Sequence, residues 1–230
     1  MIPLLFDVDG TLVDTLGAGK AALAEAMTRV YGQTGPIDEY DFHGRTDPEI
    51  VRGLLRAAGY EDAEIDPELP ALWPIYLGQL EVELSSHDGG SSVLAGVPEL
   101  LESLSDDPRF ACGLVTGNLE HGARLKLEAA GCASAFSFGA YGSDAEDRNR
   151  LPAMALSRAE ERYATRLHPE TADVIGDTPA DIRCARAVGA RVLAVATGRH
   201  SIFELAEHHP DGIVGDLTET EKVTEFFARG

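Results

Sequence analysis

Apolar residues form three successive patterns along the chain. A short apolar run, 4–6, has the length of a strand and ends abruptly at charged residues. From Gly17 to His87 apolar side chains recur at helical spacing, and nothing resembles a strand. From Val97 onward helical patterns alternate with short apolar runs. This alternation predicts a doubly wound parallel sheet with helices on both faces, an α/β Rossmann-like core.

The helical stretch after the first strand predicts a separate small all-α domain, which would be a helical-bundle cap on the core. Its expected helices span 20–31, 48–58 and 66–86, with Thr46 or Asp47 as the N-cap of the second and Pro74 kinking or delaying the third. The segment 87–92 is the most linker-like in the chain, and 15–19 forms the matching hinge. We therefore expect a core of 1–16 and 89–230 and a cap of 17–88 that opens and closes over the end of the first strand.

The rest of the core follows the same reasoning. Its expected strands are 111–115, 135–138, 172–176, 191–196 and 212–214, and its expected helices are 98–104, 119–130, 152–166, 180–188, 202–208 and 218–228.

Composition narrows the possible partners. The chain has 230 residues, of which 44% are hydrophobic, and a formal net charge of −20. This charge argues against nucleic acid or an anionic membrane as a partner, although a bound metal ion and a few Arg residues can still attract a small anion. No apolar run reaches the length of a membrane span and the start lacks the pattern of a signal peptide, so we expect a cytoplasmic protein. Cys112, Cys132 and Cys184 are scattered, and we interpret them as small core residues.

Asp7 and Asp9 directly follow the first strand. Two carboxylates this close raise each other's pKa unless a cation neutralises them. A hard divalent ion, most simply Mg²⁺, would do so through oxygen ligands. An acidic turn after a buried strand is the simpler alternative for an isolated Asp-x-Asp.

Polar residues also follow two other predicted strands. Thr116, Gly117 and Asn118 offer a hydroxyl and backbone N–H groups at a helix start, where they can hold a phosphoryl oxygen. Asp177 and Asp181 follow the strand at 172–176. Ligands of parallel sheets bind at the carboxyl ends of the strands, so these groups are expected to meet there. Helix capping alone would also explain Asn118 and either Asp.

The segment Asp7-Val8-Asp9-Gly10-Thr11 resembles the first motif of the haloacid dehalogenase-like hydrolase superfamily. The resemblance implies that Asp7 is a nucleophile that becomes an aspartyl-phosphate and that Asp9 is the general acid and base. It also implies that Thr116 binds the transferring phosphoryl group. The implied metal ligands are Asp7, the backbone carbonyl of Asp9, and Asp177, with Asp181 supporting the site.

The third motif departs from the commonest family pattern, in which Lys-Pro precedes a helix. No Lys occurs between Lys126 and Lys222, so the cation must be an Arg. We choose Arg148, which resembles a family variant with Arg-x-x-Leu, and keep Arg150 as the alternative. A guanidinium can bridge the nucleophile and the phosphate.

The expected function is Mg²⁺-dependent hydrolysis of a small phosphorylated metabolite. A phosphomutase shares the same intermediate and is the alternative within the family; a catalytically silent binding or regulatory protein is the alternative outside it. Arg45, possibly with His43, is the candidate contact of the cap with the leaving group. An exposed structural role is the competing interpretation of Arg45.

Overall fold

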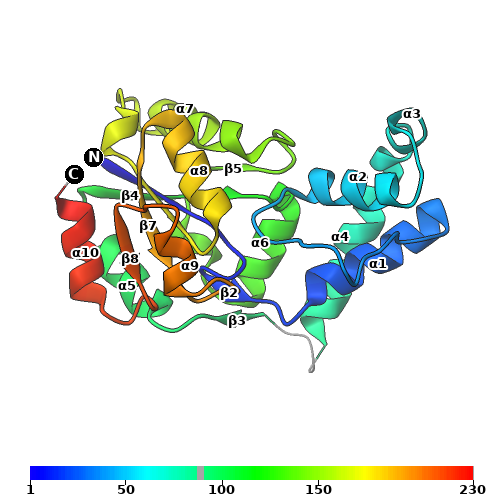
Figure 1. Cartoon of the computed structure of the whole chain (residues 1–230). Coiled ribbons are helices and arrows are strands. Elements are labelled where there is room, and N and C mark those ends of the chain that lie inside the picture. Colours follow the sequence, from blue (N-terminus) through cyan, green and yellow to red (C-terminus); the bar gives the residue numbers. More distant parts are fainter. Residues whose placement is uncertain (87–90, 230) are drawn as a thin grey trace.

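A parallel sheet forms the centre of the larger part of the molecule (Figure 1). The computed structural model describes residues 1–86 and 91–229. The six strands lie in the order β5-β4-β1-β6-β7-β8, and all neighbouring pairs are parallel. Their bounds are β1 (Ile2–Phe6), β4 (Phe110–Thr116), β5 (Gly139–Tyr141), β6 (Asp173–Gly176), β7 (Arg191–Val195) and β8 (Gly212–Val214).

Helices cover both faces of this sheet, because alternate residues of the strands point to opposite sides. In β1, Leu5 packs into one apolar cluster, whereas Leu4 and Phe6 pack into another. All three are completely buried, and each contributes about 1.5–3 kcal/mol to folding. The first cluster is closed by α7 (Leu151–Tyr163) and α8 (Pro179–Val188), and the second by α5 (Val97–Ser105), α6 (Glu120–Ala129) and α10 (Thr220–Ala228). The predicted doubly wound α/β core is confirmed.

The remaining core elements are short. They are α9 (Ile202–Ala206) and three 3-10 turns, η1 (Ala133–Ala135), η2 (Arg148–Arg150) and η3 (Pro169–Thr171).

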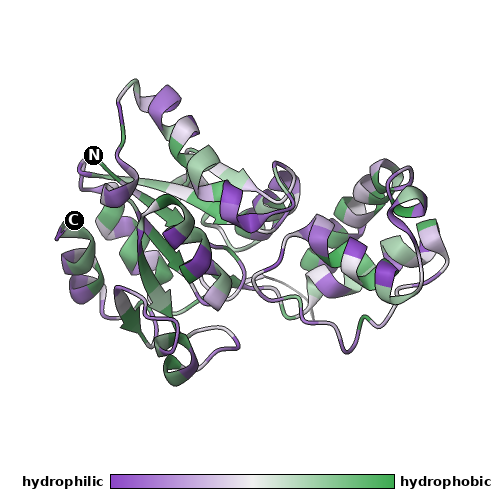
Figure 2. Cartoon of the chain, turned by 45° about the horizontal axis from the view of Figure 1, so that its top comes forward, coloured by the Kyte–Doolittle hydropathy of each residue, from purple (hydrophilic) through white to green (hydrophobic). Residues whose placement is uncertain are grey.

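The helical block consists of α1 (Ala18–Tyr31), α2 (Asp47–Ala57), α3 (Asp62–Ile65) and α4 (Leu69–Ser85). Figure 2 shows it as a lobe beside the sheet. Its apolar cluster includes Leu54 and Leu72 and extends to Leu119 at the start of α6. Glycines in the left-handed region, Gly17 and Gly32, flank α1. The sequence did not predict α3. Pro74 lies inside α4 and does not delay its start.

A two-stranded antiparallel ribbon, β2 (Val13–Asp14) with β3 (Ser92–Val93), joins the two chain segments that lead into and out of the block. No pattern in the sequence indicates this ribbon. Residues 87–90 of the predicted linker, and with them the expected domain boundary at 88/89, lie outside the described residues.

The predicted strand at 135–138 is wrong. Sheet pairing starts later, where Gly139 is in register with Leu114. The alternating Phe136 and Phe138 imitate a strand because both rings pack inward; Phe136, for example, lies 5.8 Å from the ring of Phe6. The other predicted elements of the core differ from the observed ones only at their ends.

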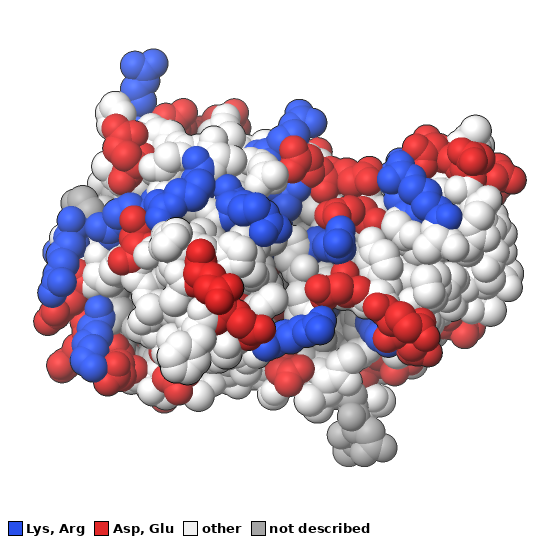
Figure 3. Space-filling model, viewed as in Figure 1, with Lys and Arg blue, Asp and Glu red and all other residues white. Residues whose placement is uncertain are grey.

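The surface carries many charges. On the face drawn in Figure 3, acidic and basic side chains lie interspersed over both parts of the molecule. Among the described residues, no helix combines the length and apolarity that a membrane crossing requires.

Candidate active site

The carboxyl ends of three neighbouring strands bring the predicted polar residues together. Asp7 follows β1, the central one of the three, and its N–H donates to the Ile175 carbonyl of β6 at 2.9 Å. Thr116 is the last residue of β4, and Asp177 follows β6. The chain continues from β1 to one side of the sheet and later returns to the other side, so these residues lie at the switch point where parallel sheets bind ligands.

Three buried carboxyl groups meet at this edge. Oxygens of Asp7, Asp177 and Asp181 lie within 4.8 Å of one another. Burial raises the pKa of Asp7 to about 6, with the charge of Arg148 opposing the shift and that of Asp181 adding to it. Burial and the charges of Asp181 and Asp7 raise the pKa of Asp177 well above its usual value. When ionised, the three carboxylates carry more negative charge than the single guanidinium of Arg148 neutralises, as expected of a site for a hard cation.

The hydrogen bonds divide the three carboxylates by role. Both oxygens of Asp181 are engaged: Arg148 Nη2 lies 2.5 Å from Oδ1, and the hydroxyl of Thr178 donates to Oδ2 at 2.7 Å. Arg148 Nη2 lies 2.9 Å from Oδ2 of Asp7, and the hydroxyl of Thr11 donates to Oδ1 of Asp177 at 3.2 Å. Within residues 1–86 and 91–229, no side chain donates a hydrogen bond to the other oxygen of Asp7 or of Asp177. This arrangement fits two metal ligands beside a supporting Asp181.

Gly10 allows these groups to approach. Its φ is +77°, and a Cβ built on it would lie 2.5 Å from Oδ2 of Asp177. A side chain at this position would therefore occupy the space beside the carboxylates.

Arg148 and Arg150 have different surroundings. Both belong to η2, but Arg148 is buried against Asp7 and Asp181, whereas Arg150 is exposed. The Nε of Arg148 is buried and has no hydrogen-bond partner among the residues that the structure describes. The Nε–H of Arg148 can therefore donate a hydrogen bond to an anion bound beside Asp7.

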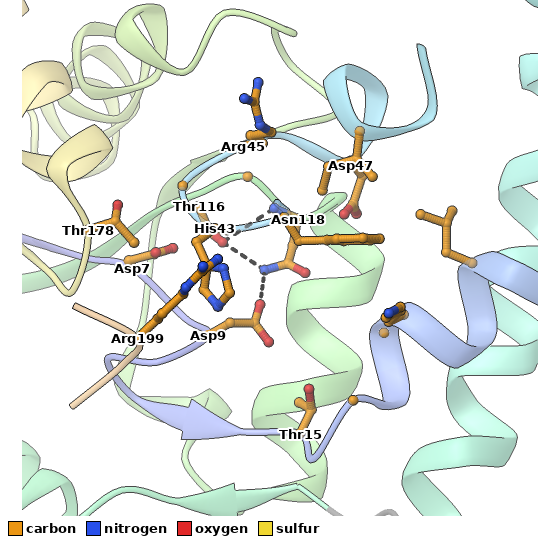
Figure 4. A pocket seen from close by; sticks show the side chains of 18 of the residues that line it. Asp7, Asp9, Thr15, His43, Arg45, Asp47, Thr116, Asn118, Thr178 and Arg199 are labelled. Atoms are coloured by element: carbon orange, nitrogen blue, oxygen red, sulfur yellow. Dashed lines mark hydrogen bonds between the residues drawn. The ribbon is translucent and has the colours of Figure 1, made fainter. Parts of the chain in front are cut away.

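Asp9 has a basic partner that the sequence analysis missed. Lys126 Nζ lies 2.8 and 2.7 Å from the two oxygens of Asp9. Nδ2 of Asn118 also donates to Oδ2 of Asp9 at 2.6 Å, as Figure 4 shows. Burial alone would raise the pKa of Asp9, but the charge and hydrogen bonds of Lys126, together with Asn118, hold it below its usual value. Asp7 and Asp9 therefore have different environments although one residue separates them.

The loop after β4 lies beside these groups. Thr116 is fully buried, and Nδ2 of Asn118 donates to its hydroxyl at 2.8 Å. The Gly117 carbonyl accepts from the N–H of Asp47 in the helical block at 2.8 Å. In return, a carboxylate oxygen of Asp47 accepts from the N–H of Leu119 at 2.8 Å. The sequence had suggested Asp47 only as a possible cap; Thr46 is the N-cap, and Asp47 joins the block to the core.

A cavity of about 540 Å³ lies between the block and the sheet edge, lined by Asp7, Asp9, Lys126 and Arg148 among others. Arg45 also lines it, but its guanidinium pairs with Glu49 and points away from Asp9 in Figure 4.

Comparisons with known proteins agree with this geometry. A sequence model described as haloacid dehalogenase-like hydrolase matches residues 4–195. The chain is 28% identical over 215 residues to a phosphoglycolate phosphatase of Synechococcus elongatus, covering 93% of this chain and 92% of the relative. It is 23% identical over 216 residues to the pyrophosphatase PpaX of Oceanobacillus iheyensis, covering 94% and 93%.

Two solved structures show the same fold. A predicted phosphoglycolate phosphatase from Haemophilus somnus has a TM-score of 0.71 at 21% identity, covering 97% of both chains. A putative beta-phosphoglucomutase from Thermotoga maritima has a TM-score of 0.63 at 19% identity, covering 98% of this chain and 99% of the other. With the family match extending over most of the sequence and the motif residues gathered at one sheet edge, the chain belongs to the haloacid dehalogenase-like hydrolases.

Proposed function

We propose that this protein is a phosphatase that hydrolyses a small phosphomonoester through an aspartyl-phosphate on Asp7, with Mg²⁺ as its metal ion. The observation that carries the proposal is the pair Asp7 and Asp9 at the end of β1, held by two different cations. Two carboxylates in distinct environments are suited to two different roles in one reaction. The names of the curated relatives, a phosphoglycolate phosphatase and a pyrophosphatase, support phosphorylated small molecules as substrates.

Asp7, the carbonyl of Asp9, and Asp177 would hold the metal ion, which would neutralise charge on the transferring group. Arg148 and Thr116, with the N–H groups of Gly117 and Asn118, would bind the phosphoryl oxygens. The Nε of Arg148, which has no hydrogen-bond partner in the part of the chain that the structure describes, supports this assignment. Asp181 would keep Arg148 in place, because it accepts a hydrogen bond from the same guanidinium.

In the first step a carboxylate oxygen of Asp7 bonds to phosphorus, and the bond from phosphorus to the leaving oxygen breaks. Asp9 must carry a proton at this point, and it donates this proton to that oxygen. In the second step water attacks phosphorus, the bond to Asp7 breaks, and Asp9 takes a proton from the water. Inorganic phosphate leaves and Asp7 is regenerated.

The helical block would close the site and select the leaving group, with Arg45 and His43 in the cavity wall. The pairing of Arg45 with Glu49 means that such a contact requires the guanidinium to turn. A panel of phosphomonoesters that includes phosphoglycolate and sugar phosphates would identify the preferred leaving group.

Phosphate release from these esters, measured with and without Mg²⁺, tests the proposal. Wild type is expected to release phosphate only with the divalent ion. Asp7→Asn should abolish release, and Asp9→Asn should lower it by about 10²–10⁴-fold, the usual range for general acid–base catalysis. Asp106→Asn, at an exposed position at the end of α5, is the matched control and should retain activity. An active Asp7→Asn protein would refute the mechanism, and phosphate transfer between sugar phosphates without release to water would indicate a mutase.

A further inference from the structure

Lys126 occupies a position where its helix otherwise buries small or apolar residues. The buried face of α6 consists of Gly122, Ala123, Lys126 and Leu127, and Lys126 is only 4% exposed. Burying an ammonium group is costly unless it is paired and hydrogen-bonded. A Lys on this face therefore indicates specific partners.

Those partners account for all three N–H donors of the ammonium group. Nζ lies within 2.8 Å of both oxygens of Asp9 and 2.6 Å from Oδ1 of Asn118. The amide of Asn118 in turn donates to Asp9 and to Thr116. Lys126 and Asn118 therefore both hydrogen-bond to Asp9, and these bonds restrict its carboxylate to one orientation.

Lys126 also lies at the boundary between the core and the helical block. A Cβ built on Gly19 of α1 would lie 3.5 Å from its Nζ, and both residues line the central cavity. The Asp9 side chain keeps 41% of its surface exposed and lines the same cavity. Arg148, by contrast, contacts Asp7 and Asp181.

We propose that Lys126 is a positioning residue of the active site, which acts through Asp9 by aiming its carboxylate at the leaving oxygen and later at the attacking water. This inference rests on the proposed phosphatase function. The observation behind this inference is the buried ammonium group, whose three N–H donors are all hydrogen-bonded to Asp9 and Asn118. Loss of Lys126 should therefore impair proton transfer rather than phosphate binding.

Esters with different leaving groups distinguish impaired proton transfer from impaired phosphate binding. Departure of an alkyl alcohol requires a proton, whereas nitrophenolate leaves without one. With Lys126→Met, which keeps an apolar stem on the buried face of α6, kcat/KM for an alkyl phosphate should fall about 100-fold, within the range that general acid–base catalysis supplies. For 4-nitrophenyl phosphate kcat/KM should change less than about 3-fold, because it reports only the steps up to departure of the leaving group. A burst of nitrophenolate should appear, because water attack on the aspartyl-phosphate becomes slow.

A conservative variant at Lys126 and a control at an exposed Lys complete the test. Lys126→Arg retains the charge but places its planar N–H groups differently, so the same selective loss should appear in weaker form. Lys222→Met, at an exposed position on α10, should behave as wild type. Melting curves should show that each variant folds.

The proposal is overturned if the Lys126 variants keep wild-type kcat/KM for the alkyl ester, or if both esters lose activity equally. If wild type itself releases no phosphate from either ester, the proposed function fails instead. The two failures are therefore distinguishable.

Discussion

Asp47 gives the most quantitative prediction, because it is a buried carboxylate that couples the helical block to the core. It is 8% exposed, and burial raises its pKa to about 6, outweighing the charge of Lys126 and the N–H of Leu119. The charge of Asp9 adds to the shift, and Tyr76 of α4 also lies within electrostatic reach. Because the pKa is higher in the folded than in the unfolded protein, the ionised form opposes folding. The contribution of Asp47 to stability is thus most favourable at low pH and is lost as pH rises from about 4 through about 6.

The pKa shift of Asp47 sets the size of the effect. A pKa that rises from 3.8 in the unfolded protein to about 6 in the folded protein lowers the free energy of unfolding by about 3 kcal/mol at pH 8 and by about half of that at pH 5. Asp47→Asn keeps an oxygen to accept the N–H of Leu119 but introduces a buried amide donor, which costs about 1 kcal/mol if unpaired. The variant should therefore be about 2 kcal/mol more stable than wild type at pH 8, which is about 4–8 °C in Tm. At pH 5 most of this gain should disappear.

Urea unfolding at both pH values measures the difference, with the exposed Asp106→Asn as a control that should stay within about 0.5 kcal/mol of wild type. A variant that is less stable than wild type at pH 8, or equally stabilised at both pH values, would show that an ionised Asp47 does not oppose folding.

Two other predictions concern the proposed metal site and the position of the helical block. Mg²⁺ at about 100 times its Kd should stabilise wild type by about 2.7 kcal/mol. In a thermal shift assay Asp177→Asn should abolish this stabilisation, whereas Asp106→Asn should keep it. Equal stabilisation of the Asp177→Asn protein would contradict the role of Asp177 as a metal ligand. A Cβ at Gly117 would collide with the Arg45 carbonyl, so Gly117→Ala should prevent the helical block from packing on the core. We expect kcat/KM to fall by about 100-fold and the radius of gyration in solution scattering to increase. Gly78→Ala, where a Cβ meets nothing within 4 Å, is the control, and an unchanged Gly117→Ala protein would show that this contact is dispensable.

The sequence predicts most of the fold because its signals are local. Helical and strand periodicities, with glycines at the ends of helices, give the α/β alternation and the helical block. The placement of polar residues after strands indicates which side chains share one edge, as seen for Asp7, Thr116 and Asp177. Aromatic side chains that pack inward from a connecting segment imitate a strand, and the strand predicted at 135–138 is therefore wrong.

The missed site residues depend on contacts that are distant in sequence. Lys126 pairs with a carboxylate 117 positions away, and Asp47 with an amide 72 positions away. Only a weak signal pointed to Lys126, namely a charged residue on an otherwise buried helix face. Asp47 had a sufficient local explanation at a helix start, which concealed its contact with the core.

In the proposed reaction Asp7 becomes covalently phosphorylated. Rapid acid quenching during turnover, followed by peptide mass spectrometry, would trap and locate this intermediate. We expect one phosphoryl group on Asp7, formed in wild type and absent from Asp7→Asn. Steady phosphate release without a phosphorylated peptide, or with the phosphoryl group on another residue, would contradict it.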